Sequence, residues 1–207
     1  MPKSKHEIIV FDADPENFAV EYEEEHPIGH SRYGGVVVDL PPDILCPDLP
    51  FWAQLDLAKF APHDPYNLLP KVGQLIFFFD IESGKNKIIY TEIENSKLCR
   101  HVRDRDESWG FLIIDIRKST EDVKERYDQE SGEWDCFAGS EKSKIFGLFT
   151  HCQMEEDEVL NITEERIVLL QVGENRFNDE GVFSVVISLA DLKAQNFESC
   201  EIYWAQS

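Results

Sequence analysis

The stretch FWAQLDLAKFAPHDPYNLLPKVGQLIFFFD, residues 51–80, decides the fold of this chain. Its first seven residues alternate between apolar side chains and Trp52, Gln54 and Asp56, which is the period of two typical of a β-strand. Asp56 can cap a short helical turn over LAKF. A loop closed by Pro70 then leads to a nearly continuous apolar run over residues 74–81, typical of a strand that is covered on both faces. The stretch therefore predicts a strand, a helical turn, a loop and a second strand.

A fainter copy of this stretch returns near the end of the chain as IVLLQVGENRFNDEGVFSVVISLADLKAQNF, residues 167–197. In each copy a glutamine, Gln54 or Gln171, interrupts an apolar strand, and a glycine, Gly73 or Gly181, precedes a second apolar run. The spacing from glutamine to glycine is 19 residues in the first copy and 10 in the second. Two interpretations remain open: an ancient duplication into two similar halves, or a recurring β-hairpin composition.

The rest of the chain alternates short apolar runs with turn-forming residues. These patterns predict further strands at 7–12, 36–38, 87–93, 111–116, 166–172, 182–187 and 200–205. Helices are expected after Asp14-Pro15, over 119–128 with Ser119 as cap, and from the Ser188 cap to Asn196. Counting eight to ten strands and three or four short helices, we expect a strand-dominated α+β fold with antiparallel or mixed sheets. No linker divides the chain, so residues 1–207 are expected to form one domain, either undivided or as two similar half-structures.

Net charge excludes some partners. The 20 Lys and Arg against 41 Asp and Glu give −21, which would repel a phosphate backbone or an anionic membrane surface. We therefore expect no nucleic-acid and no membrane partner. The acidic residues are partly clustered in EYEEEH, residues 21–26, and MEEDEV, residues 154–159. Such charge either keeps the protein soluble or steers it toward a basic partner.

Apolar runs and cysteines indicate the compartment. No apolar run approaches the roughly 18 residues of a membrane span, and the run at residues 8–11 is too short for a signal peptide. The five cysteines are odd in number and form no C-x-x-C pair, which favours reduced thiols. We therefore expect a cytoplasmic protein.

Six motifs follow one another in the order typical of the YwqG-like family, a mainly bacterial family of uncharacterised cytosolic proteins: FWAQLDLAKF, LLPKVGQLIFFFD, KIFGLFTHCQ, VLLQV, NDEGVFSVVISLADLKAQNF and YWAQS. The chain resembles this family over residues 34–207, and residues 1–33, an expected strand and helix, fall outside the resemblance. Two motifs differ: Gly34-Gly35 is not followed by the usual Trp-Pro, and Phe177-Asn178-Asp179 replaces Trp-Gly-Asp. The resemblance implies an α+β fold with repeated sheet units and no established reaction.

Glutamines within or beside apolar strands are the main candidate site residues: Gln54, Gln153, Gln171 and Gln206. A buried glutamine without partners costs a few kcal/mol, so each is expected either to bond neighbouring backbone or to line a polar cleft. In the second interpretation a cleft between the two halves is lined by Gln54, Gln171, Trp52, His151 and Asp179.

Catalytic and metal-binding patterns are weak. His151 and Cys152 are adjacent on an expected strand and point to opposite faces, so His151 is not expected to activate Cys152. His26 and His30 have helical spacing, but Pro27 and Gly29 lie between them, and we expect no metal site and no cofactor. Phosphate-binding loops and the G-x-S-x-G serine motif are absent from the sequence.

These observations favour a non-enzymatic interaction module whose acidic surface binds a basic protein, for example an immunity-like protein that neutralises a cationic toxin. The alternative is a small-ligand-binding protein, or an enzyme of a type that these patterns do not detect, with its cleft between the two halves.

Overall fold

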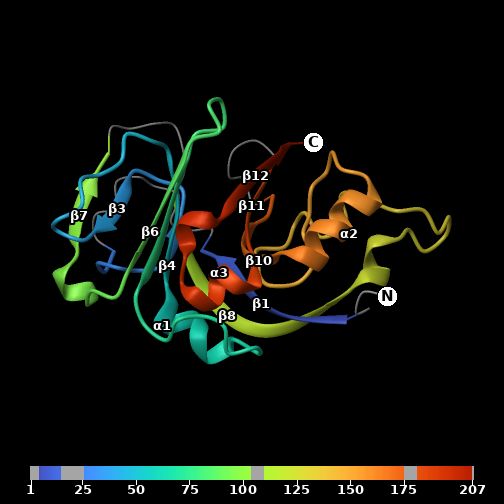
Figure 1. Ribbon diagram of the computed structural model, residues 1–207, viewed down its shortest axis with the longest axis horizontal. Coiled ribbons are helices and arrows are strands. Elements are labelled where there is room, and N and C mark those ends of the chain that lie inside the picture. Colours follow the sequence, from blue (N-terminus) through green and yellow to red (C-terminus); the bar gives the residue numbers. More distant parts are fainter. Residues whose placement is uncertain (1–4, 15–25, 104–109, 175–180, 207) are drawn as a thin grey trace. The chain divides into compact units, whose positions relative to one another are not determined.

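Strands dominate the computed structural model, which describes residues 5–14, 26–103, 110–174 and 181–206 (Figure 1). Within these residues there are twelve β-strands but only three α-helices, of 4, 10 and 6 residues. The expected α+β class is therefore wrong, and the protein is mostly β. One physical reason is that the segment expected to be a helix over 119–128 forms extended and 3₁₀ structure instead. Contacts between Cα atoms divide the chain into two compact units.

Unit 2 comprises residues 12–62 and 69–116. Its strands follow the order β8-β2-β4-β5-β6, where β8 continues beyond residue 116 into unit 1, and β3 and β7 form a separate two-stranded sheet. The bounds are β2 Arg32–Tyr33, β3 Val37–Leu40, β4 Phe51–Asp56, β5 Gln74–Phe79, β6 Asn86–Thr91, β7 Cys99–Val102 and β8 Phe111–Asp122, with the helix α1 at Leu57–Phe60. Their pairings are antiparallel, and Val38, Leu40, Phe51, Ile76, Phe78 and Ile89 form one buried apolar cluster.

Unit 1 comprises residues 1–11, 63–68 and 117–207. Its strands follow the order β12-β11-β10-β9-β1. The bounds are β1 Lys5–Ala13, β9 Lys144–Ile145, β10 Ile167–Val172, β11 Gly181–Ile187 and β12 Glu201–Gln206, with α2 at Glu156–Glu165 and α3 at Leu189–Ala194. These pairings are also antiparallel. A buried cluster of Phe149, Val159, Val168 and Val186 joins α2 to β10 and β11.

The hairpins expected from the opening stretch and its copy are confirmed. Strand β4 pairs with β5 and β5 pairs with β6, while β10 pairs with β11 and β11 with β12. All six residues of β5 are buried, as the continuous apolar run predicts. Asp56 caps α1 by accepting a hydrogen bond from the Ala58 N–H at 3.1 Å, and the Ser188 hydroxyl caps α3 by accepting from the Asp191 N–H at 3.0 Å.

Two helix predictions differ from the structure. Residues expected to form a helix over 119–128 instead continue β8 to Asp122 and then form a 3₁₀ turn, Val123–Arg126. The Asp122 carboxylate accepts a hydrogen bond from the Lys124 N–H at 3.0 Å, which caps the turn rather than a full helix. A helix that was not expected, α2, begins in the acidic segment 154–159. Its first turn holds Glu156, Asp157 and Glu158, which the positive end of the helix dipole stabilises. The helix expected after Asp14 falls at residues 15–25, outside the described residues.

Candidate functional site

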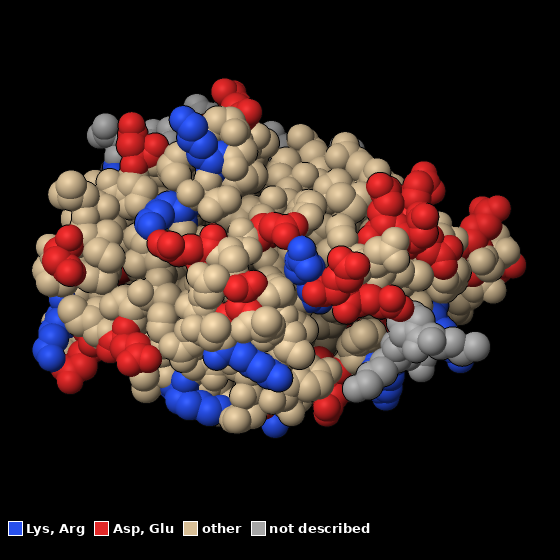
Figure 2. Space-filling view, viewed as in Figure 1, with Lys and Arg blue, Asp and Glu red and all other residues tan. Residues whose placement is uncertain are grey.

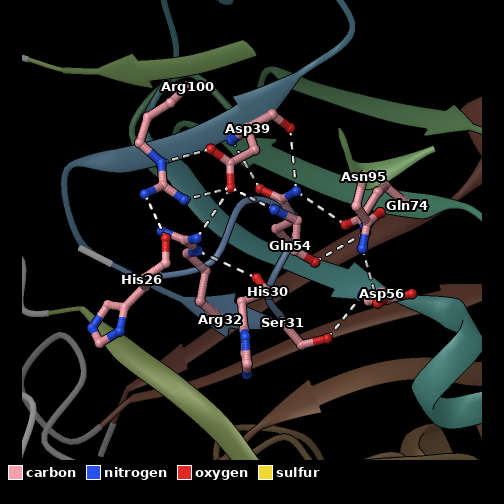
Figure 3. A network of polar contacts seen from close by, with 11 residues as sticks. His26, His30, Ser31, Arg32, Asp39, Gln54, Asp56, Gln74, Asn95 and Arg100 are labelled. Atoms are coloured by element: carbon pink, nitrogen blue, oxygen red, sulfur yellow. Dashed lines mark hydrogen bonds and ion pairs between the residues drawn. The ribbon is translucent and has the colours of Figure 1, made fainter. Parts of the chain in front are cut away.

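A buried carboxylate held by two arginines forms the centre of a polar network in unit 2 (Figure 3). Asp39 lies on β3 directly opposite Arg100 on β7, and Arg32 comes from β2. Arg100 Nε lies 2.8 Å from Asp39 Oδ1 and its Nη2 lies 3.0 Å from Oδ2, while Arg32 Nη2 lies 3.1 Å from Oδ2. We call Asp39, Arg32 and Arg100 the Asp39 cluster.

The ionised form of Asp39 is favoured although the side chain is completely buried. Burial alone would raise the pKa of Asp39, because it removes water from the charge. Hydrogen bonds from Arg100 and from the Gly29 N–H, together with the charge of Arg32, outweigh burial and hold the pKa below its ordinary value. A carboxylate with this set of donors is saturated, which suits a positioning role rather than proton transfer.

Two buried glutamines extend the network away from Asp39. Gln54 on β4 bonds the backbone of Asp39 twice: its Oε1 accepts from the Asp39 N–H at 3.0 Å, and its Nε2 donates to the Asp39 carbonyl at 3.2 Å. The same Nε2 lies 3.0 Å from Oε1 of Gln74 on β5. Gln74 Nε2 in turn donates to the Gly29 carbonyl at 3.0 Å and to Asn95 Oδ1 at 2.8 Å. Gln54 therefore acts as a substitute strand partner for β3.

The far end of the network reaches the start of α1. Asn95 Nδ2 donates to Asp56 Oδ2 at 3.1 Å, and the Asp56 N–H donates to the Ser31 hydroxyl at 2.8 Å. Asp56 thus joins the helix cap to the polar network. Both ends of the network include residues of the segment 26–32.

The network fixes the backbone of residues 26–32. Arg100 Nη1 donates to the His26 carbonyl at 2.6 Å, and Arg32 Nε donates to the His30 carbonyl at 3.3 Å. Gly29 has φ +76°, and a Cβ there would lie 2.5 Å from Asn95 Cγ, so any other residue needs a strained backbone and a shift of Asn95. Burial, and next the charge of Arg32, lower the pKa of both His26 and His30, so the two rings are neutral at pH 7.

Unit 1 contains a second buried carboxylate held by two cations. Lys144 Nζ on β9 lies 2.8 Å and 2.7 Å from the two oxygens of Glu121 on β8, and Arg126 Nη2 lies 3.2 Å from Oε1. The Leu148 N–H also donates a hydrogen bond to Glu121 at 2.9 Å. Arg126 Nη2 donates a hydrogen bond to the Thr150 hydroxyl at 2.7 Å. We call Glu121, Arg126 and Lys144 the Glu121 cluster.

Opposite charges set the ionisation of the Glu121 cluster. Burial raises the pKa of Glu121, but Lys144 and Arg126 outweigh it and bring the pKa to about 2. Burial lowers the pKa of Lys144 to about 8, against the opposing effect of Glu121. All three side chains are charged at pH 7. Lys144 forms an ion pair with Glu121, and because its side chain is fully buried, it is inaccessible to substrates.

The residues predicted to line a cleft have separate surroundings. Gln54 belongs to the network of the Asp39 cluster, and Trp52 Nε1 donates to the Phe79 carbonyl at 2.6 Å. In unit 1, Gln171 Nε2 donates to the carbonyls of Gly139 and Lys142 at 3.0 and 2.8 Å. His151 is buried beside the rings of Phe149 and Tyr203. Asp179 lies outside the described residues, and the shared cleft stays a prediction.

The carboxylates and cations of both clusters were missed as candidates. Asp39 sits in the apolar run VVVDL, so it carries the same signal as the glutamines, a polar residue inside a buried strand. Glu121 and Lys144 lie in charged segments, where nothing in the sequence marks them as buried.

The described part of the chain has no metal-binding group and no membrane-spanning helix. No group of three or more His, Cys, Asp and Glu side chains there is arranged to hold a metal ion. Among the same residues, the helices are too short or too polar to cross a bilayer. His151 and Cys152 are both buried, and burial raises the pKa of Cys152 to about 11, which disfavours the thiolate that nucleophilic catalysis requires.

Comparison with known proteins gives a family but no activity. No curated protein matches the chain. A family described as a domain of unknown function, DUF1963, matches residues 17–205, which include every residue of both buried clusters. The chain therefore belongs to the DUF1963 family of proteins of unknown function.

Proposed function

We propose that this protein is a non-enzymatic interaction module that binds a basic protein through an acidic surface, in the manner of an immunity-like protein. The proposal is supported most directly by how charge is divided between the interior and the surface. The two clusters place four cations and two carboxylates in ion pairs, and five of these six side chains are at most 3% exposed. Together the six groups carry +2, so the remaining groups carry −23 of the net −21.

One acidic face of unit 1 concentrates this charge. We define the acidic face by exposed carboxylates of the loop 128–135 and of α2 with its cap: Asp128, Glu130, Glu133, Asp135, Glu155, Asp157, Glu158, Glu164 and Glu165. The segments 128–141 and 153–165 contain no Lys or Arg. Red side chains gather over this part of unit 1, at the right of the space-filling view (Figure 2). A basic partner would therefore meet carboxylates without intervening cations of these segments.

Side-chain contacts hold the two halves of the acidic face together. The Tyr127 hydroxyl donates a hydrogen bond to Glu156 in the first turn of α2. Trp134 stacks edge-to-face on Tyr127, with ring centroids 5.4 Å apart, and packs against the apolar cluster that includes Val159. The carboxylates of the loop and the helix are thus presented by a fixed backbone. A preorganised charged surface raises association rates and specificity at a smaller entropic cost than a flexible one.

Binding of a synthetic Lys- and Arg-rich peptide, measured by calorimetry at low and high salt, tests the proposal. The informative variant changes Glu133, Glu164 and Glu165 to Lys; the last two lie in the final turn of α2, where cations suit the helix dipole. The matched control changes Asp43, Asp48 and Glu82, exposed residues of unit 2, to Lys. Both variants have a net charge of −15 instead of −21, because each replaces three carboxylates by three cations.

We expect the acidic-face variant to lose at least about tenfold in affinity and the control to lose much less, with binding that weakens as salt screens the charges. Equal losses in the two variants would show attraction to net charge alone, and affinity that is insensitive to salt would contradict the electrostatic contact.

The proposal also covers the family group and the cellular compartment of the protein. We infer that it is a YwqG-like member of its family and that it works in the cytoplasm. The motifs from FWAQLDLAKF to YWAQS support the first, and five cysteines that form no disulfide support the second.

A further inference from the structure

Unsatisfied polar atoms gather in the interior of unit 1. Gln171 and Ser184 are 0% and 1% exposed, and Gln171 Oε1 and Ser184 Oγ have no hydrogen-bond partner among the described residues. A buried polar atom without a partner costs about 1–3 kcal/mol. Two such atoms in one place indicate that something else bonds them.

Strand register places the two atoms side by side. Gln171 on β10 is the direct partner of Ser184 on β11, and directly opposed residues of an antiparallel pair project from the same face. The amide orientation of Gln171 follows from its bonds, because its Nε2 donates to the carbonyls of Gly139 and Lys142. Its Oε1 is therefore an acceptor that requires a donor.

His151 adds a third acceptor on the same side of the sheet. Its ring lies edge-to-face on Tyr203, with centroids 6.2 Å apart, and Tyr203 is the direct strand partner of Ser184 on β12. Burial lowers the pKa of His151, so the ring is neutral, and it already bonds the backbone of Trp204. The remaining nitrogen, Nδ1, is buried without a partner among the described residues. A neutral imidazole whose donor is used presents an acceptor at its other nitrogen.

Charge limits what can bind here. Lys144 is the strand partner of Gln171 on its other side, and the Glu121 cluster to which it belongs carries +1. A cation would be repelled by this charge, and an anion would face the acceptor oxygen of Gln171. The chemistry that fits is a small neutral molecule that donates hydrogen bonds.

In unit 2 the corresponding buried glutamine is satisfied by protein atoms. There the strand glutamine Gln54 has both ends satisfied, its Oε1 by the Asp39 N–H and its Nε2 partly by the side chain of Gln74. In unit 1 the neighbouring strand supplies Ser184, whose hydroxyl makes no hydrogen bond to Gln171. We propose that unit 1 contains an internal site for one water molecule, which donates to Gln171 Oε1 and bonds Ser184 Oγ as a permanent part of the fold.

A crystal structure of the full chain at about 1.5 Å resolution or better tests this directly. We expect a density peak within hydrogen-bond distance of both Gln171 Oε1 and Ser184 Oγ. A direct hydrogen bond between the two side chains, or no peak between them, would overturn the proposal.

Water relaxation dispersion in solution gives a second reading, because it counts water molecules that stay bound for longer than the protein tumbles. We expect Ser184→Val, which removes one polar partner and fills the space, to lower this count by one relative to the wild type. Ser83→Ala, at an exposed hydroxyl of unit 2, is the control and should leave the count unchanged. An equal count in Ser184→Val and wild type would contradict the site, and if that variant does not fold, the wild-type density decides.

Discussion

Arg100 donates hydrogen bonds to both carboxylate oxygens of Asp39, with Nε 2.8 Å from Oδ1 and Nη2 3.0 Å from Oδ2. This two-point contact joins β3 to β7, and the remaining nitrogen of the guanidinium, Nη1, bonds the His26 carbonyl. A planar guanidinium is the side chain best suited to such a contact, because its donors match the spacing of carboxylate oxygens. The pair therefore links the small sheet of unit 2 to the segment 26–32.

Removing the charge of Asp39 should strongly destabilise the protein. Asp39→Asn leaves the buried Arg32 and the partly exposed Arg100 without their counter-ion, and breaking a buried ion pair costs about 3–5 kcal/mol. Urea denaturation followed by circular dichroism measures the change in the free energy of unfolding. The control is Glu94→Gln, which breaks the exposed pair of Glu94 with Lys97, and it should not change this free energy measurably. Similar stabilities of the two variants would show that the Asp39 cluster adds little.

Stability should fall in acid through Glu121. The pKa of Glu121 is about 2 in the folded protein against an ordinary value of 4.5, so between these pH values the unfolded chain binds a proton that the folded chain does not. Its contribution is therefore complete above pH 4.5 and is lost as the pH falls toward 2. The free energy of unfolding, measured by urea denaturation at a series of pH values, should decline over this range. Asp39, whose pKa is also lowered, adds to the decline in the same direction.

Glu121→Gln separates this contribution from general acid effects. The variant should be less stable than the wild type at pH 7 and should converge toward it as the pH falls, because only the wild type has the carboxylate to lose. Glu133→Gln, at an exposed residue, should follow the wild-type curve. A constant difference between Glu121→Gln and wild type from pH 6 to pH 2.5 would contradict the lowered pKa.

Gly29 should tolerate alanine less well than another glycine with similar backbone geometry. Gly29 and Gly84 have φ +76° and +67°, so alanine at either position has a left-handed backbone that costs about 1–2 kcal/mol. At Gly84 an added Cβ meets nothing within 4 Å, whereas at Gly29 it would lie 2.5 Å from Asn95 Cγ. We expect thermal denaturation to show a larger loss for Gly29→Ala than for Gly84→Ala. Equal losses would mean that Asn95 moves aside and that its bonds to Asp56 and Gln74 are unimportant.

The sequence predicts the hairpins well because their signals are local. The alternation over residues 51–57 and the continuous apolar run over 74–81 are patterns of neighbouring residues, and β4 and β5 have nearly these bounds. All six residues of β4 are buried, however, so the alternation does not show that both of its faces are covered. The expected α+β class was wrong partly because residues 119–128 have a helical pattern but begin as a strand, in which Glu121 is buried. Strand pairing and burial depend on residues that are distant in the sequence, and they outweigh the local helical preference. Helix α2 was missed because its surface is mostly carboxylates, with Val159 as its single buried residue.

The candidate site was only partly predictable for the same reason. A glutamine in an apolar strand is conspicuous, so Gln54 and Gln171 were identified, and both are completely buried. Their partners come from elsewhere in the chain: Asp39 lies 15 residues before Gln54, and Gly139 lies 32 residues before Gln171. The pattern within a strand indicates that a polar residue is buried, but only the fold shows which groups form hydrogen bonds with it.

Cysteine reactivity should follow burial. Cys99 is exposed, whereas Cys152 and Cys200 are buried, and burial raises the pKa of Cys152 to about 11 and that of Cys200 to about 12. Because only the thiolate reacts, a rise of about 2 pKa units above 9.0 lowers the reactive fraction about 100-fold at pH 8. Iodoacetamide should therefore modify Cys99 at least about 100-fold faster than Cys152 or Cys200, as measured by peptide mass spectrometry over time.

Unfolding provides the decisive comparison for these thiols. In concentrated urea Cys99, Cys152 and Cys200 lose their different surroundings, so their rates of modification should become similar. In the native protein Cys99→Ser should leave the slow modification of Cys152 and Cys200 unchanged. Modification of Cys152 as rapid as that of Cys99 in the native protein would place its thiol in contact with solvent. It would also remove the burial argument against a nucleophilic Cys152, and so weaken the case for a non-enzymatic protein.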